Sequence, residues 1–284
     1  MDGGANIRLR IEKRRGISER AIGETADLMR IRQRVARILL PYGRKMRVLR
    51  GPAKGMRFIV QPGMGFSYAF GSEAAAPRSF AQWITQGATV YDVGSNKGQM
   101  ALIFAALVGR SGRVLAFEPA PAEYASLVLN LRLNDLRQVR AFQAAAFDAA
   151  CELQFAYPSE SPTQGKLVSV ETTYSHKNAQ VFPVSAVPLD AMLKEGPPPS
   201  VIKIDVEGSA AAVLRGARRI IEAVAPAVYV ELHGPEEQAG IRDELLAHGY
   251  VAQTLSGDYV ADPASRWHSP LWCHKPESAR LSGI

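Results

Sequence analysis

From Ala88 onward, short apolar runs alternate with segments long enough for a helix, and this alternation constrains the fold most strongly. Each run has the length of a buried strand, and each segment between runs can cross from one parallel strand to the next. The pattern therefore predicts an α/β domain with a mostly parallel sheet covered by helices on both faces. The predicted strands span 89–93, 113–117, 139–144, 201–204 and 227–230, and the predicted helices span 99–108, 122–133, 210–223 and 236–248.

Two further apolar runs close the chain, at 250–255 and 270–274. The polar segment between them is rich in Gly, Asp and Pro and is too short for a crossover helix, so we expect these runs to pair antiparallel at one edge of the sheet. Between residues 151 and 188, prolines and glycines interrupt three β-like stretches. We interpret 151–188 as a β-rich insertion or lid and not as a second domain.

Basic residues are concentrated at the N-terminus. Residues 1–57 contain 16 Lys and Arg against 5 Asp and Glu, whereas the remaining residues contain 18 against 22. We assign residues 1–50 to a basic, partly helical arm and 51–284 to the main domain. The arm has a helical apolar spacing that ends at Pro41, formed by Leu28, Ile31, Val35, Ile38 and Leu39.

The arm has two interpretations: a helix packed on its own domain, or a helix docked on an anionic membrane surface. Nucleic acid is not an expected partner, and the sequence does not indicate an oligomeric state. No apolar run has the length of a membrane span or signal sequence, and the two cysteines, Cys151 and Cys273, lie far apart. We therefore expect a cytoplasmic protein, with the inner face of the membrane as an alternative location.

The most informative motif is an apolar strand that runs into a glycine turn, with Asp92, Gly94 and Gly98 at its key positions. A dinucleotide fingerprint would also place glycine at positions 96 and 99, which are Asn96 and Gln99 here. A carboxylate before the first glycine would repel a diphosphate, but it suits a ligand that carries an ammonium and a sulfonium. S-adenosylmethionine is such a ligand.

A second acid, Glu118, ends the next predicted strand, 20 residues after Gly98. A carboxylate at this place can accept hydrogen bonds from both ribose hydroxyls of a nucleoside. The two motifs together predict a set of cofactor-binding residues: Asp92, Gly94, Ser95, Asn96, Gly98, Glu118 and Pro119.

From about residue 51 to residue 233 the chain resembles the FkbM-type S-adenosylmethionine-dependent methyltransferases. The resemblance is carried by the segments 92–98, 117–119, 130–134 and 187–190, and above all by 202–208 followed by 213–217. It implies a class I, Rossmann-like fold, for which we expect seven strands in the order 3-2-1-4-5-7-6 with the last strand antiparallel. One position departs from the family, because Ala210 stands where a glutamate is usual. If the family uses that acid to contact substrate or metal, this chain has a different acceptor, a relocated acid or weakened activity. If the acid only packs or caps the helix, little changes.

Candidate catalytic residues follow the fourth and fifth predicted strands. Asp205 and Glu207 come after the strand at 201–204, and His233 comes after the strand at 227–230, so all three belong to one edge of the sheet. Each is a candidate for the base that accepts a hydroxyl proton, and a histidine base would make the rate rise through about pH 6.5. Asp205 with Glu207 could instead bind a divalent cation, an alternative that we do not favour; we assign no metal ligand. Lys203 lies inside an apolar strand, so it requires a carboxylate partner.

The function implied by the resemblance is methyl transfer to a hydroxyl group of a small molecule or glycan. Two alternatives remain open: an RNA methyltransferase that uses the basic arm to hold phosphates, and a non-catalytic protein of the same fold that docks on an anionic membrane.

Overall fold

The computed structural model describes residues 41–61, 80–157, 165–168, 180–233, 235–253 and 271–274. The helix expected at 28–39, and with it most of the predicted arm, lies outside the described residues. In the described part of the chain, no helix is both long and apolar enough to cross a membrane.

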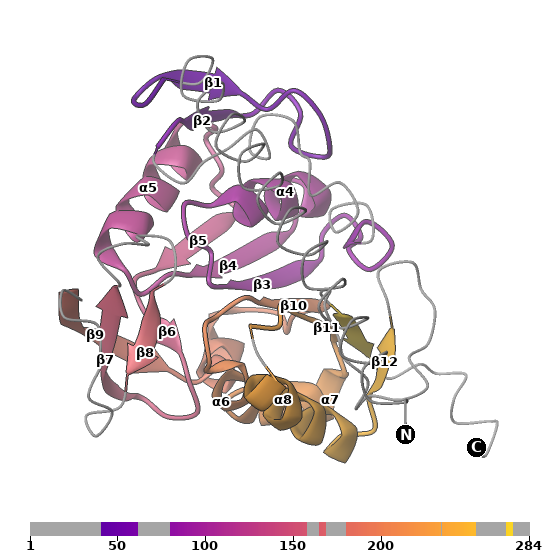
Figure 1. The fold of residues 1–284 in the computed structure, drawn as a ribbon. Coiled ribbons are helices and arrows are strands. Elements are labelled where there is room, and N and C mark those ends of the chain that lie inside the picture. The colour runs from indigo at the N-terminus through magenta and orange to yellow at the C-terminus, as the bar shows by residue number, and fades with distance from the viewer. Residues whose placement is uncertain are drawn as a thin grey trace, which may run out of the picture.

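Among the described residues, seven strands form the central sheet in the order β5-β4-β3-β10-β11-β13-β12 (Figure 1). Numbered along the chain from β3, this order is the predicted 3-2-1-4-5-7-6. The last strand, β13, runs antiparallel to both β11 and β12, whereas the other neighbouring pairs are parallel. The strands are β3 (Thr89–Val93), β4 (Arg113–Phe117), β5 (Val139–Phe142), β10 (Val201–Ile204), β11 (Ala227–Val230), β12 (Val251–Gln253) and β13 (Leu271–His274).

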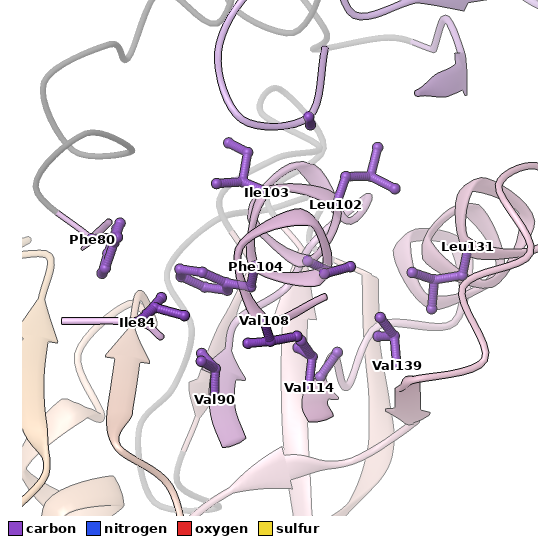
Figure 2. Packing of buried hydrophobic residues seen from close by; sticks show 14 of the residues in the cluster. Phe80, Ile84, Val90, Leu102, Ile103, Phe104, Val108, Val114, Leu131 and Val139 are labelled. Carbon is purple, nitrogen blue, oxygen red and sulfur yellow. The ribbon is translucent and has the colours of Figure 1, made fainter. Parts of the chain in front are cut away.

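Helices cover both faces of this sheet, because alternate strand residues point to opposite sides and both sides are apolar. Val90 and Val114 pack with the helices of one face, α4 (Gln99–Val108) and α5 (Pro121–Arg132), as Figure 2 shows for α4. Their neighbours Tyr91 and Leu115 pack on the other face. That face is covered by η1 (Leu189–Glu195), α6 (Ala210–Arg215), α7 (Arg218–Val224) and α8 (Pro235–Ala247).

The helix predicted at 210–223 is divided into α6 and α7 at Gly216 and Ala217. A Cβ atom on Gly216 would overlap the backbone carbonyl of Phe147, so the chain passes too close to its neighbour for a larger residue. The carboxylate of Asp190 accepts the backbone N–H groups of Arg219 and Ile220, both at 3.0 Å, and thereby caps the start of α7.

Two smaller sheets bring the strand count above that predicted. The segment from 151 onward contributes three strands to a four-stranded sheet in the order β6-β9-β7-β8, and an antiparallel hairpin of β1 and β2 precedes the central sheet. The predicted arm, 1–50, therefore includes the first strand of this hairpin. The strands are β1 (Lys45–Arg47), β2 (Arg57–Ile59), β6 (Ala145–Ala146), β7 (Cys151–Tyr157), β8 (Lys166–Val168) and β9 (Gln180–Val187).

Side chains of α5 and of the turn that follows it hold the hairpin against the domain. Asn134 accepts the backbone N–H of Arg57 at 2.6 Å and donates to its carbonyl at 2.7 Å, and Asn130 accepts the N–H of Ile59 at 3.0 Å. Asn130 also donates to the carbonyl of Lys97 at 2.8 Å, in the glycine turn after β3. The hairpin and the glycine turn are thus connected through one side chain.

Candidate active site

The glycine turn after β3 has a backbone that only glycine can adopt at its first position. Gly94 has φ +76°, and a Cβ atom there would overlap the carbonyl oxygen of Asp205 at the end of β10. Asn96 and Gly98 also have positive φ, 49° and 90°. The turn therefore brings β3 into direct backbone contact with the Asp205 loop, and α4 begins immediately after it.

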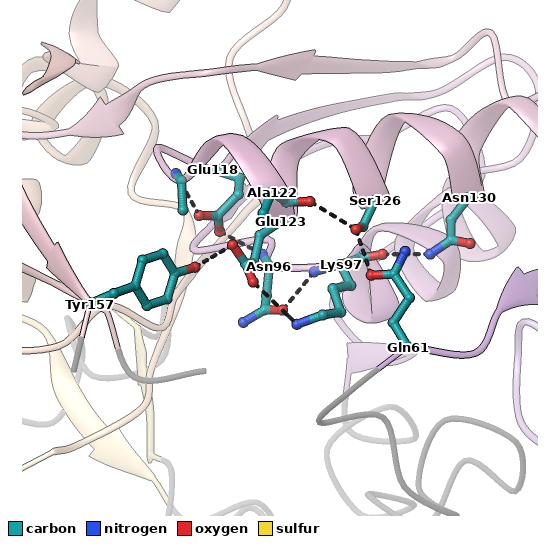
Figure 3. Close-up of polar contacts among 10 residues, drawn as sticks. Gln61, Asn96, Lys97, Glu118, Ala122, Glu123, Ser126, Asn130 and Tyr157 are labelled. Atoms are coloured by element: carbon teal, nitrogen blue, oxygen red, sulfur yellow. Dashed lines mark hydrogen bonds and ion pairs between the residues drawn. The ribbon is translucent and has the colours of Figure 1, made fainter. Parts of the chain in front are cut away.

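Glu118 stands at the end of β4 and faces this turn. Its carboxylate accepts the backbone N–H groups of Asn96 at 2.8 Å and Ala120 at 3.0 Å (Figure 3). Burial raises the pKa of Glu118 to about 7, although the two N–H groups favour the charged form. Glu118 is thus a buried carboxylate at the position expected for a ribose acceptor.

A second polar network joins the turn to the four-stranded sheet. Lys97 is buried and forms an ion pair with Glu123 of α5, with 3.4 Å between Nζ and Oε1. The hydroxyl of Tyr157, on β7, donates to the other carboxylate oxygen of Glu123, as Figure 3 shows. Burial and Glu123 both raise the pKa of Tyr157, so this phenol remains protonated.

One cavity lies at the carboxyl ends of these strands, with about 720 Å³ of empty space when the volume open to solvent is included. One part of its wall comes from the central sheet and its turns, and the other part comes from the four-stranded sheet and the loop after β10. Its lining residues are Val93, Gly94, Asn96, Phe117, Glu118, Pro119, Ala144, Ala145, Ala146, Phe155, Tyr157, Gly165, Lys166, Leu167, Asp205, Val206, Glu207 and Ser209.

Four predicted cofactor residues, Gly94, Asn96, Glu118 and Pro119, are in this lining, and Ser95, Gly98 and Asp92 are not. Asp92 is fully buried behind the turn, and its Oδ1 lies 3.3 Å from Nζ of Lys203 on the neighbouring strand. The expected carboxylate partner of Lys203 is therefore confirmed.

Lys203 connects the two halves of the site. Its ammonium donates to the carbonyl of Gly94 at 2.8 Å and lies 3.4 Å from Oδ2 of Asp205. Burial alone would lower the pKa of Lys203, but Asp92 and Asp205 outweigh it and hold this pKa above its usual value. Lys203 is thus a permanent positive charge between the glycine turn and the Asp205 loop.

His233 lies between two carboxylates. Its Nε2 is 3.0 Å from Oδ1 of Asp205, and its Nδ1 is 3.6 Å from Oε1 of Glu207. The hydrogen bond to Asp205 raises the pKa of His233 to about 9 against the opposing effect of burial. Burial would raise the pKa of Asp205, but Lys203 and His233 lower it to about 2. His233 is therefore an imidazolium at neutral pH, and it does not line the cavity, whereas Asp205 and Glu207 do.

Residues 92–252 match the family model of the Methyltransferase FkbM domain, which covers more than half of the chain. The chain belongs to the FkbM methyltransferase family. This is a family of S-adenosylmethionine-dependent enzymes, as the resemblance of the sequence implied. The hairpin of β1 and β2 lies before the matched region.

Solved structures are similar to this chain only at low identity and with TM-scores below 0.5. An FkbM methyltransferase from Methylobacillus flagellatus is 19% identical, with a TM-score of 0.46, over 66% of this chain and 43% of that protein. An O-methyltransferase from Thermotoga maritima is 11% identical, with a TM-score of 0.43, over 77% and 66%. A fibrillarin from Aeropyrum pernix, solved with S-adenosyl-L-methionine, is 12% identical, with a TM-score of 0.41, over 68% of each chain. No match was found among curated proteins.

The position at which this FkbM chain lacks the usual glutamate is occupied by a buried alanine, Ala210, at the start of α6. An acid from α8 lies beside it: Glu237 accepts the backbone N–H of Ala210 at 3.1 Å and that of His233 at 3.3 Å. Burial raises the pKa of Glu237. A carboxylate is therefore present at the N-terminus of α6, but it comes from a segment 27 residues further along the chain.

Asp205, Glu231 and His233 also come close enough for a cation, since one ligand atom from each lies within 4.8 Å of the others. However, Nζ of Lys203 and Nε2 of His233 already compensate the charge of Asp205. This arrangement differs from the Asp205–Glu207 pair considered from the sequence, and we assign no metal to it.

The sequence did not indicate the wall that the four-stranded sheet contributes. Phe155, Tyr157 and Leu167 line the cavity, yet their segment shows only β-like alternation interrupted by Pro and Gly. Glu237 was missed for a different reason, because it is one of four acidic residues on α8 and nothing in the sequence places it beside α6. Neither the wall residues nor Glu237 have a local pattern that distinguishes them from structural residues.

Proposed function

We propose that this FkbM protein transfers a methyl group from S-adenosylmethionine to a hydroxyl of a small molecule or glycan. The observation that carries the proposal is the single cavity shared by the glycine turn, Glu118, Asp205 and Glu207. The hydroxyl as acceptor is supported by the family resemblance.

The residues of the turn suit a nucleoside with a positive charge at its far end. Glu118 offers a carboxylate to the two ribose hydroxyls, and Gly94 and Asn96 of the turn line the same cavity. When bound, S-adenosylmethionine supplies an electrophilic methyl group on a sulfonium. Asp205 and Glu207 line the same cavity, and their carboxylates favour a sulfonium bound beside them.

Methyl transfer to a hydroxyl is an in-line displacement, so positioning contributes most and a base adds about 10²–10⁴ in rate. We assign the proton acceptor to Glu207, which lines the cavity, and treat His233 as a positioning residue. An imidazolium cannot accept a proton, but it can orient the carboxylates of Asp205 and Glu207 on either side. Asp205 then contacts the reacting groups as an orienting carboxylate.

The acidic end of the cavity supports a neutral acceptor over RNA. Asp205 and Glu207 line this end, and Glu231 lies behind them with Asp205 and His233. Carboxylates repel a phosphate backbone, whereas they accept hydrogen bonds from hydroxyl groups.

Calorimetric titration with S-adenosylmethionine tests the proposal. We expect Glu118→Gln to weaken binding by one to two decades, because hydrogen bonds to a charged acceptor contribute about 1.5–3 kcal/mol. The exposed Glu152, outside the cavity, provides the matched control Glu152→Gln, for which we expect wild-type affinity. Because the pKa of Glu118 is about 7, wild-type affinity should rise up to about tenfold from pH 6 to pH 8, and that of Glu118→Gln should stay constant.

Transfer itself is measured with S-adenosylmethionine carrying a tritiated methyl group and a panel of hydroxylated small molecules and oligosaccharides. Label in an acid- and base-stable ether product supports O-methylation. Failure of the wild-type protein to bind S-adenosylmethionine would contradict the proposal. If the protein binds this cofactor but transfers the label only to RNA, RNA replaces the small molecule or glycan as the acceptor.

A further inference from the structure

The hairpin of β1 and β2 has an unusual charge. Residues 41–61 contain six basic residues and no acidic residue, and all six basic side chains are exposed. Among the described residues, none of the six forms an ion pair with a carboxylate. They are Arg44, Lys45, Arg47, Arg50, Lys54 and Arg57.

The register of the hairpin places like charges opposite each other. Arg47 on β1 is the direct cross-strand partner of Arg57 on β2, and Lys45 points to the same face as Arg47 because it lies two residues away. Like charges directly opposite in an antiparallel pair destabilise the pair. The hairpin therefore maintains an unfavourable arrangement that a bound anionic surface would relieve.

The inner face of the hairpin fixes these charges in place. Val48, Phe58 and Val60 are buried in the main core, and Asn130 and Asn134 hold the backbone of β2. The three basic side chains of the outer face thus stand on a rigid support, on the outer side of the layer formed by α4 and α5 (Figure 1).

Large apolar side chains accompany the basic ones. Leu49, between Arg47 and Arg50, is 47% exposed, and Tyr42 is 51% exposed. A bilayer interface accepts basic side chains at its headgroups and apolar side chains just below them. A nucleic-acid backbone would satisfy only the charges.

We propose that the outer face of the β1–β2 hairpin, formed by Lys45, Arg47 and Arg57 with Leu49 beside them, docks on an anionic lipid bilayer. This surface is separate from the cavity, and the proposal does not depend on the proposed methyl transfer. Residues 58–284 carry a net charge of −4, so the hairpin side of the protein would face the membrane.

The test is sedimentation of the full chain with vesicles of phosphatidylcholine alone or mixed equally with phosphatidylglycerol. Each basic residue near an anionic surface contributes about 1 kcal/mol, so the triple variant K45Q/R47Q/R57Q should bind mixed vesicles one to two decades more weakly. The matched control R110Q/R137Q/R219Q removes the same charge from exposed positions outside the hairpin and should bind as wild type does. Leu49→Ala, made alone in the wild-type background, should also weaken binding to the mixed vesicles.

Equal binding of the wild type and the hairpin variant to mixed vesicles would overturn the proposal. So would hairpin-dependent binding of transfer RNA without binding of vesicles. If the triple variant does not fold, the single variants Arg47→Gln and Arg57→Gln test whether the hairpin charges bind the mixed vesicles. Each removes the cross-strand repulsion and should keep or raise the melting temperature, while binding of mixed vesicles falls several-fold.

Discussion

Single residues at this site act through close backbone approach and through buried charge. Gly94 permits contact between the glycine turn and the carbonyl of Asp205, and Lys203 compensates the charge of Asp92 where both side chains are buried. Removal of one partner of such a buried ion pair typically costs about 3–5 kcal/mol, because the other charge is left uncompensated. The conformation of the turn and that of the Asp205 loop therefore depend on each other.

Two glycines of the site allow this dependence to be measured. Gly94 and Gly208 share φ +76°, but a Cβ atom on Gly94 would overlap the Asp205 backbone, whereas nothing lies within 4 Å of one on Gly208. We expect Gly208→Ala to cost only the strain of the left-handed backbone, about 1–2 kcal/mol. Gly94→Ala should cost more than 3 kcal/mol, because the backbone of β10 must also move. Chemical denaturation checks both values, and equal losses would contradict the contact.

The pH dependence of turnover distinguishes two roles of His233. Its folded pKa is about 9, above the ordinary 6.5, so the imidazolium is present at neutral pH and is lost as the pH rises through about 9. As a positioning cation, His233 should give a constant kcat from pH 7 to pH 8 and a fall through about 9. A rise in kcat over the same interval would instead identify His233 as the base. The sequence led us to expect an increase through pH 6.5 for a histidine base; the hydrogen bond to Asp205 raises the pKa of His233 to about 9 and moves that expected increase to higher pH. His233→Gln, which does not titrate, should show no change through pH 9.

At the scale of elements, polar side chains of α5 and the following turn hold β2 because their spacing matches that of alternate residues of the strand. Ser126, Asn130 and Asn134 recur every four residues along α5 and the turn that follows it, a spacing of about 6 Å in a helix, and two residues of a strand span about 6.6 Å. They contact Gln61, Ile59 and Arg57, the alternate residues of β2 and its extension. Figure 3 shows the part of this ladder that reaches the glycine turn.

Asn130 and Asn134 provide a matched pair of variants, because only Asn130 contacts the turn. Asn130→Asp keeps an acceptor for Ile59 but replaces the donor to the Lys97 carbonyl with a carboxylate oxygen. We expect it to weaken S-adenosylmethionine binding about tenfold, the value of one hydrogen bond. Asn134→Asp should lower the melting temperature similarly and leave cofactor affinity within twofold. If calorimetry gives equal S-adenosylmethionine affinities for the two variants, Asn130 contributes to stability and not to cofactor binding.

At the scale of the whole molecule, the cavity is assembled from two sheets of different kinds. The central sheet supplies strand ends on one edge, and the four-stranded sheet supplies an apolar wall through Phe155 and Leu167. The hydrogen bond from Tyr157 to Glu123 links the two. The hairpin is connected to the glycine turn through Asn130, so a third sheet supports the site without lining the cavity.

The effect of an N-terminal truncation should therefore depend on whether the deletion ends before the hairpin or after it. Deletion of residues 1–37 leaves the hairpin and its contacts to α5 in place, and we expect cofactor affinity within a few-fold of the full chain. Deletion of residues 1–61 removes the buried Phe58 and Val60 as well as the ladder, and it should lower both stability and affinity. Titration calorimetry and thermal unfolding of the two proteins check this; equal behaviour would contradict the coupling.

The sequence alone determined the alternation of strands and helices and the glycine turn, because each depends on spacing within a short segment. The order of the central strands was implied by the resemblance to the FkbM family. The acids at the strand ends followed from the rule that parallel strands share a carboxyl edge. Only the tertiary structure decided which carboxylate compensates Lys203, that Glu237 lies beside Ala210, and that His233 carries a proton. These features depend on distances between atoms far apart in the chain, and electrostatic energies change with such distances and with burial, neither of which a local pattern records.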